Sequence, residues 1–295
     1  MDKVTGTIIS DWSQLTSISQ SMFPLSYRGH RESAWDLSTS LERMIQSLRT
    51  NDYLPPENRE HWLLHEFKRK STLYRNNLPA ENDKIEWLAL MQHYGTPTRL
   101  LDFTHSIYIA AFFAIEYATA DAAIWGINTN ELHRMSWDVF NIPKENYELR
   151  DRMNMKIIKH ANTLIGEYRR KDIPNFVIPI EPNILSERMN AQKGLFMMPS
   201  NISTSFLDNL IAGFGISMSE IENPTFVDPS EFTGRFGERL LLKIEEFPKL
   251  LKIVIPSNMI DDGIELLSSM NLTAETLFSG IDGMARSLIQ TLIRS

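Results

Sequence analysis

The 295-residue chain contains no cysteine, which excludes disulfide bonds, thiolate catalysis and cysteine-ligated zinc for these residues and fits a reducing compartment. A long hydrophobic run is also lacking. The longest run, residues 107–115, is interrupted by Tyr108 and is about half the length needed to span a bilayer. Residues 1–6 lack the apolar segment of a signal peptide. We therefore expect a soluble, cytoplasmic protein that does not enter a membrane.

Positive charge is scarce, with 30 Lys and Arg against 37 Asp and Glu and a net charge of −7. A long basic groove for duplex nucleic acid is therefore not expected. Two short basic stretches, residues 67–70 together with Arg75 and residues 169–171, are interpreted as solvated helix faces. Hydrophobic residues make up 42% of the chain, which is ordinary for a globular protein of one large α+β domain or two closely packed ones.

Hydrophobic periodicity predicts helices and strands in both halves of the chain. Helices are expected from residue 12 and at residues 41–50, 57–79, 84–93, 107–117, 188–192, 257–270 and 281–294. Strands are expected at residues 4–9, 26–29, 35–39, 122–127, 175–180, 194–198, 239–244 and 252–255. Residues 129–182 are mostly polar with helical spacing, and we interpret them as a helical insertion or capping segment.

The first motif is Tyr27-Arg28-Gly29-His30, at the end of a predicted strand. A glycine allows the backbone to approach a ligand closely, and a guanidinium suits bidentate recognition of a phosphate or carboxylate. The structural alternative for Arg28 is a buried ion pair, for example with Asp102. His30 either contacts a ribose or nucleobase or is a surface histidine after a turn.

The second motif is the ten-residue run His93-Tyr94-Gly95-Thr96-Pro97-Thr98-Arg99-Leu100-Leu101-Asp102. His93 ends a predicted helix, where it either donates to helix carbonyls or acts as an acid or base near physiological pH. Arg99 and Asp102 are three residues apart on an extended segment, so one is expected to face a cleft and the other the interior. Asp102 is either a base or a buried carboxylate that anchors a turn.

Further segments follow in a fixed order. They are Trp35-Asp36-Leu37, the small-residue helix Ala110 to Ala114, an Arg-x-x-x-Gln-x-Gly-x-Phe pattern at Arg188, Gln192, Gly194 and Phe196, and Leu277 to Gly283. Together with the two motifs, these segments resemble the FRG-domain family over residues 20–287, with core motifs at 20–128 and 183–287. Phe103 stands where the family usually has tryptophan, and Ser279-Gly280 where Pro-Asp is more usual.

FRG domains have been likened to ADP-ribosyltransferases. The resemblance therefore implies an α+β fold in which a split, mixed or antiparallel sheet, flanked by helices, holds NAD in a cleft. It implies that Arg28 orients NAD and that residues 98–104 form a second binding motif. Gln192 stands near the position of a transferase glutamate, and an amide positions groups by hydrogen bonding but is not a base. Glu238, Glu245 and Glu246 are the alternative carboxylates.

The predicted site follows from the motifs and the resemblance together. Its catalytic residues are Arg28, His93, Asp102 and Gln192. Its cofactor-binding residues, with NAD as the cofactor, are Arg28, Gly29, His30, Tyr94, Thr98, Arg99, Thr104 and Phe196. No metal site is predicted, because His61 and His65 have no evident third ligand.

Two function hypotheses remain open. The first is an NAD- or nucleotide-binding, ADP-ribosyltransferase-like effector that modifies a protein or nucleic acid. For this hypothesis the resemblance implies a context of phage defence or toxicity. The second is a non-catalytic module that recognises a nucleotide or RNA and regulates a partner. The presence or absence of NAD consumption separates the two hypotheses.

Overall fold

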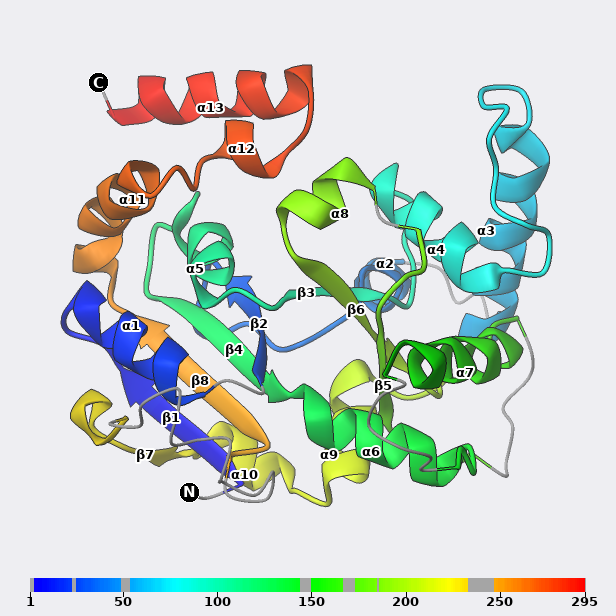
Figure 1. Ribbon diagram of the computed structural model, residues 1–295, viewed down its shortest axis with the longest axis horizontal. Coiled ribbons are helices and arrows are strands. Elements are labelled where there is room, and N and C mark those ends of the chain that lie inside the picture. Colours follow the sequence, from blue (N-terminus) through cyan, green and yellow to red (C-terminus); the bar gives the residue numbers. More distant parts are fainter. Residues whose placement is uncertain are drawn as a thin grey trace.

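The computed structural model describes residues 3–22, 25–48, 54–143, 150–166, 173–184, 186–232 and 247–294. Through this part of the chain runs an eight-stranded mixed sheet, in the order β5-β6-β3-β2-β4-β8-β1-β7 (Figure 1). The strands are β1 (Val4–Ile8), β2 (Leu25–His30), β3 (Leu101–Thr104), β4 (Ala122–Asn128), β5 (Val177–Ile180), β6 (Gly194–Pro199), β7 (Thr225–Phe226) and β8 (Leu250–Ile255).

The sheet is mixed because β1 pairs in parallel with both β7 and β8, whereas the other neighbours are antiparallel. The α+β class with helices around a mixed sheet is thus confirmed. The expected split into two sheets is wrong, since one hydrogen-bonded sheet continues through all these strands. Its narrowest junction lies between β2 and β3, which are paired only at Tyr27 and Thr104.

Helices cover both faces of the sheet. They are α1 (Trp12–Ser21), α2 (Ser40–Ser47), α3 (Pro56–Ser71), α4 (Lys84–His93), α5 (Ile107–Ile115), α6 (Thr129–Val139), α7 (Arg150–Thr163), α8 (Glu187–Ala191), α9 (Phe206–Phe214), α10 (Met218–Glu222), α11 (Ile260–Ser269), α12 (Ala274–Leu277) and α13 (Ile281–Arg294). Two 3₁₀ turns lie at Pro229–Glu231 and Ser257–Met259. No helix among the described residues is both long enough and apolar enough to cross a membrane.

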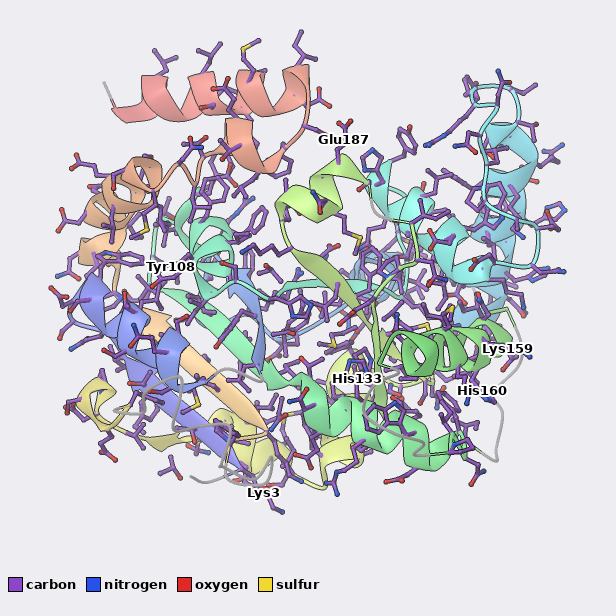
Figure 2. All side chains as sticks on the ribbon, in the orientation of Figure 1. Lys3, Tyr108, His133, Lys159, His160 and Glu187 are labelled. Atoms are coloured by element: carbon purple, nitrogen blue, oxygen red, sulfur yellow. The ribbon has the colours of Figure 1, made fainter. Side chains whose placement is uncertain are left out.

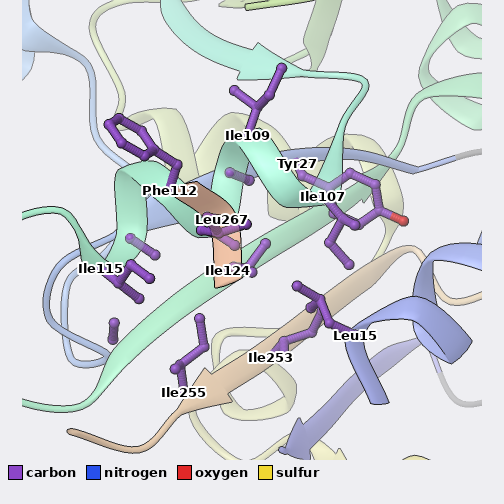
Figure 3. Close-up of a cluster of buried hydrophobic side chains, with 14 of the residues drawn as sticks. Leu15, Tyr27, Ile107, Ile109, Phe112, Ile115, Ile124, Ile253, Ile255 and Leu267 are labelled. Atoms are coloured by element: carbon purple, nitrogen blue, oxygen red, sulfur yellow. The ribbon is translucent and has the colours of Figure 1, made fainter. Parts of the chain in front are cut away.

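Helix α5 begins where the Ser106 side chain accepts from the backbone N–H of Ile109, as the Thr-His-Ser sequence predicted. Its apolar face packs against β2, β4 and β8, in a core cluster that includes Tyr27, Ile124 and Ile253 (Figure 3). A Cβ atom placed on Gly29 would lie 2.1 Å from the carbonyl oxygen of Ala110. Gly29 therefore allows helix α5, and not a ligand, to approach the strand closely.

The same face carries a second core cluster farther along the sheet, where Trp87 of α4 and Ile157 of α7 pack over Phe196 and Ile180. Helix α9 covers the opposite face, with Phe206 among the residues packed against β3 and β6. Side chains of Leu101 and Phe103 point to α9, so Asp102 between them points to the face of α4 and α5.

Most predicted elements appear near their expected bounds, with several differences, among them the short elements α10, α12 and β7, which were not predicted. Residues 35–39 form no strand, and the helix expected at 57–79 ends at Ser71. The segment 129–182 holds α6 and α7 but also β5, the edge strand of the sheet. Helix α9 was not predicted. The strand expected at 239–244, the carboxylates Glu238, Glu245 and Glu246, and the basic stretch 169–171 lie outside the described residues.

Candidate functional site

A cavity of 440 Å³ is lined by α4, α8, the loop that precedes α4, and the paired strands β3 and β6. The sheet contributes Asp102 and Phe196, which are register partners. His93 comes from the end of α4, and Gln192 caps the end of α8. Four residues predicted from widely separated motifs therefore meet at one cavity.

Two guanidinium groups, those of Arg75 and Arg188, also line this cavity. Within the described residues, neither has a carboxylate within 4.0 Å. The guanidinium of Arg188 lies 4.5 Å from the ring centroid of Phe278, and burial lowers its pKa against the opposing effect of Asp102. Both guanidinium groups therefore offer N–H donors that suit the oxygens of an anion.

Partial burial, followed by the charges of Arg188 and Arg75, lowers the pKa of His93. The imidazole is therefore mostly neutral at pH 7 and is able to accept a proton. Its ring is in edge contact with Tyr94 at 4.9 Å between centroids, and Tyr94 itself is exposed and does not line the cavity. His93 thus has the protonation state of a base rather than that of a cationic helix cap.

Three carboxylates line the cavity, those of Glu86, Asp102 and Glu187, and the first two are in contrasting situations. Buried Glu86 accepts from the backbone N–H groups of Asn183 and Ile184, so its oxygens already hold a loop in place. The side chain of Asp102 is exposed, and among the described residues its carboxylate has no hydrogen-bond or ion-pair partner. Asp102 is therefore available to a ligand, as is the exposed Glu187 of α8, and it is not a buried turn anchor.

The side-chain amide of Gln192 donates to the backbone carbonyl of Leu277 at 3.0 Å. The backbone carbonyl of Gln192 accepts from the hydroxyl of Thr104 at 2.7 Å. Gln192 therefore joins α8, β3 and α12 at the wall of the cavity. Thr104 is buried and does not line the cavity, so it acts on the site through Gln192.

Arg28 and Asp102 were expected to line one cleft, and the register of the sheet contradicts this. Arg28 is the partner of Trp125, on the α9 face, whereas Asp102 points to the opposite face. The two residues still make contact, because Nη1 of Arg28 donates to the backbone carbonyl of Asp102 at 2.7 Å. The alternative of an ion pair between them is wrong as well, since the acceptor is the carbonyl and not the carboxylate.

His30 is 6% exposed, so its interpretation as a surface histidine is wrong. Nε of Arg28 donates to Nε2 of His30 at 3.2 Å, which leaves Nδ1 to donate to the carbonyl of Trp35 at 3.2 Å. Burial, followed by the charge of Arg28, lowers the pKa of His30 to about 3. The ring is therefore neutral at physiological pH and orients Arg28.

Arg99 is 1% exposed and does not line the cavity. Its guanidinium forms a bidentate ion pair with Glu60, with 2.6 Å between Nε and Oε1, and it also donates to the carbonyl of Leu164 at 3.3 Å. As the spacing predicted, Arg99 faces the interior and Asp102 faces the cavity. Thr98 is also buried. Its hydroxyl donates to the side chain of Gln92, and its backbone N–H and carbonyl both bond to the hydroxyl of Ser40.

Two features of the site were not recognised from the sequence. Arg75 was interpreted as part of a solvated helix face, but helix α3 ends at Ser71 and Arg75 lies beyond it, at the cavity. Arg188 was noted only as a motif position, and its proximity to Asp102 depends on how α8 lies over β3.

Comparison with known families gave a match over part of the chain. Residues 24–123 match the family model of the FRG domain. The chain thus carries an FRG domain, which contains both motifs and Asp102, while Arg188 and Gln192 lie beyond the matched residues. Comparisons with curated proteins and with solved structures found no match.

Proposed function

We propose that this FRG-domain protein binds NAD or a related nucleotide in the cavity between α4 and α8 and acts as an ADP-ribosyltransferase-like effector. One observation carries the proposal. Two guanidinium groups without carboxylate partners among the described residues and the available carboxylate of Asp102 face the same 440 Å³ cavity. The volume falls within the range of about 300–1,000 Å³ that is common for small-molecule sites.

The donor set fits a dinucleotide. Arg75 and Arg188 match the two phosphates of such a ligand, because guanidinium groups bind phosphate oxygens in pairs. Phe196, Leu90 and Met189 offer apolar surface for a base or ribose. This combination of a cationic and an apolar wall favours a nucleotide over an uncharged ligand.

NAD, when bound, supplies an ADP-ribosyl group whose transfer breaks the bond between ribose and nicotinamide and develops positive charge on the ribose. The carboxylate of Asp102 is placed to oppose such a charge inside a partly enclosed cavity. Neutral His93 is placed to accept the proton that an attacking acceptor hydroxyl or amine loses. Gln192 acts as a positioning residue, since its amide is committed to Leu277.

The hydrogen bond from Gln192 to Leu277 favours a second candidate function, a nucleotide-recognition module without catalysis. Helix α8 supplies an amide where a transferase would supply a carboxylate, and that amide is bonded to the segment before α13. Arg188 contacts Phe278 in that segment as well. A ligand that engages Arg188 would therefore act on the C-terminal helices, which is how a module could signal occupancy. A role in phage defence or toxicity is supported by the family resemblance alone.

The ligand test is a thermal-shift measurement with NAD, ADP and AMP. At 100 times its dissociation constant, a ligand stabilises the folded state by about 2.7 kcal/mol. Arg188→Gln should abolish the shift, while Lys159→Gln on α7, which removes the same charge outside the cavity, should preserve it (Figure 2). If none of these nucleotides shifts the melting temperature, the cavity is not a nucleotide site.

Catalysis is tested with NAD labelled in the adenosine half and in nicotinamide. Release of nicotinamide that Asp102→Asn abolishes, without loss of the NAD thermal shift, supports the enzyme. Binding without release or transfer of label, also in the presence of cell lysate as a source of acceptor, supports the module.

A further inference from the structure

A second group of cations lies on the α9 face of the sheet, opposite to the cavity. Arg28, Trp125 and Lys252 are successive register partners across β2, β4 and β8, so their side chains stand in one row. His30 lies two residues beyond Arg28 on the same face. Arg43 of α2 joins them, because the charges of Arg28, Arg43 and Lys252 all act on His30. We call Arg28, Arg43, Trp125 and Lys252 the Trp125 cluster.

The three cations of the Trp125 cluster have no carboxylate within 4.0 Å in the described part of the chain. Arg28 donates to an imidazole and a carbonyl, and Arg43 donates to the carbonyl and hydroxyl of Ser38. Nζ of Lys252 lies 5.0 Å from the ring centroid of Trp125. Burial lowers the pKa of Lys252 despite the opposing charge of Asp36. The half-buried Arg28 and Lys252 and the exposed Arg43 thus bring three positive charges together without a carboxylate partner among the described residues.

The indole N–H at the centre of the row is also unsatisfied. Trp125 is 3% exposed, and its Nε1 atom has no hydrogen-bond acceptor among the described residues. Buried donors in folded proteins are nearly always paired with protein or bound groups. A buried donor beside three cations that lack a carboxylate partner suits a ligand that carries both negative charge and acceptor oxygens.

We propose that the Trp125 cluster binds a phosphate group, with the cations balancing its charge and the indole N–H of Trp125 donating to one of its oxygens. The compact tetrahedral anion carries enough acceptors to serve several donors at once. It comes either from free phosphate or from the phosphate of a small nucleotide. The site is separate from the cavity of Asp102, because the sheet lies between the two. The proposal of a phosphate site therefore does not depend on whether that cavity binds NAD.

The test is a phosphate titration at constant ionic strength, followed through the ¹⁵N–¹H resonance of the Trp125 indole. Trp125→Phe identifies the resonance by its disappearance. Phosphate should move this resonance with saturation, and Lys252→Gln should weaken the apparent affinity by about tenfold or more. Arg43→Gln, on the exposed face of α2, should weaken it as well and carries little risk for folding. Lys159→Gln, the matched loss of one charge on α7, should leave it unchanged.

The same titration with AMP separates the two sources. Tighter binding of AMP than of phosphate identifies a nucleotide phosphate, and tighter binding of phosphate identifies the free anion. Arg188→Gln should not alter the response of Trp125, which keeps this site distinct from the cavity. The proposal is overturned if neither ligand moves the Trp125 resonance, or if the movement persists undiminished in both Lys252→Gln and Arg43→Gln.

Discussion

The amide nitrogen of Gln192 lies 3.0 Å from the carbonyl oxygen of Leu277, which ties the end of α8 to the end of α12, just before α13. The bond needs a donor at position 192, and a carboxylate there would face a carbonyl with no proton between them. Gln192 therefore has a structural role that a glutamate would perform poorly.

We expect Gln192→Glu to lower the free energy of unfolding by about 1–3 kcal/mol, because the Leu277 carbonyl loses its donor. Urea unfolding followed by circular dichroism measures the change. Gln46→Glu, an equivalent replacement at an exposed position of α2, should change the stability little and serves as the control. Equal stabilities of Gln192→Glu and the unaltered protein would show that the bond contributes nothing.

Arg99→Met should destabilise the fold by about 3–5 kcal/mol, since it leaves the carboxylate of Glu60 buried without its partner. The double variant Arg99→Met/Glu60→Leu should recover much of that loss, because no isolated charge remains. Removal of Arg69 from its exposed pair with Glu66 should cost less than about 1 kcal/mol. Chemical denaturation of the four proteins compares these values, and an Arg99→Met variant as stable as the Arg69 variant would contradict the prediction.

Gly29→Ala should destabilise the protein by about 1–3 kcal/mol, the usual cost of overpacking a core. The added methyl group would lie 2.1 Å from the Ala110 carbonyl oxygen and 2.5 Å from the Ala114 nitrogen, both backbone atoms of α5. Truncation of side chains on α5 should therefore not rescue the variant, which melting temperatures of Gly29→Ala with and without Phe113→Ala can check. A rescue would mean that the helix is free to move away from β2.

The buried, neutral His30 predicts a specific pH dependence. Its pKa is about 3 in the folded protein, against about 6.5 for an unperturbed histidine. Below pH 6.5 the unfolded chain binds more protons than the folded one, so stability falls as the pH falls from 6.5 towards 3. The loss from this group is about 1.4 kcal/mol for each pH unit within that window.

His30→Gln should remove this contribution, so its stability should decline less between pH 6.5 and 4.5 than that of the unaltered protein. Urea midpoints at several pH values provide the comparison. His65, whose side chain is 66% exposed, supplies the control variant His65→Gln. Identical slopes for the His30 variant and the unaltered protein would mean that His30 becomes protonated in the folded state.

The elements with local signals were predictable from the sequence. Asp83 and Ser106 cap α4 and α5 as expected, because the cap and the apolar run lie within a few residues of each other. Residues 35–39 show the limit of such signals. The segment alternates like a strand, yet the carbonyl of Trp35 pairs with His30 and no neighbouring strand is available.

The cavity was predicted in part. His93, Asp102, Gln192 and Phe196 were identified by motif, whereas the separation of Arg28 from Asp102 depends on register, which shifts every side chain to the other face when it changes by one residue. The burial of Arg99 depends on Glu60, a partner on a different element. The spacing of residues in the sequence predicts neither the strand register nor the pairing of Arg99 with Glu60.

The parallel pairing of β1 with β8 imposes an order on folding. Thr5 meets Leu251, so the first described strand is not joined to β4 and the rest of the sheet until the last described strand has been synthesised. Closure of so long a loop is slow, because its entropy is lost before the contact forms. During translation, β1 and the free edge of β4 therefore remain exposed at the same time. We expect the nascent chain to aggregate or to bind chaperones most readily during this interval.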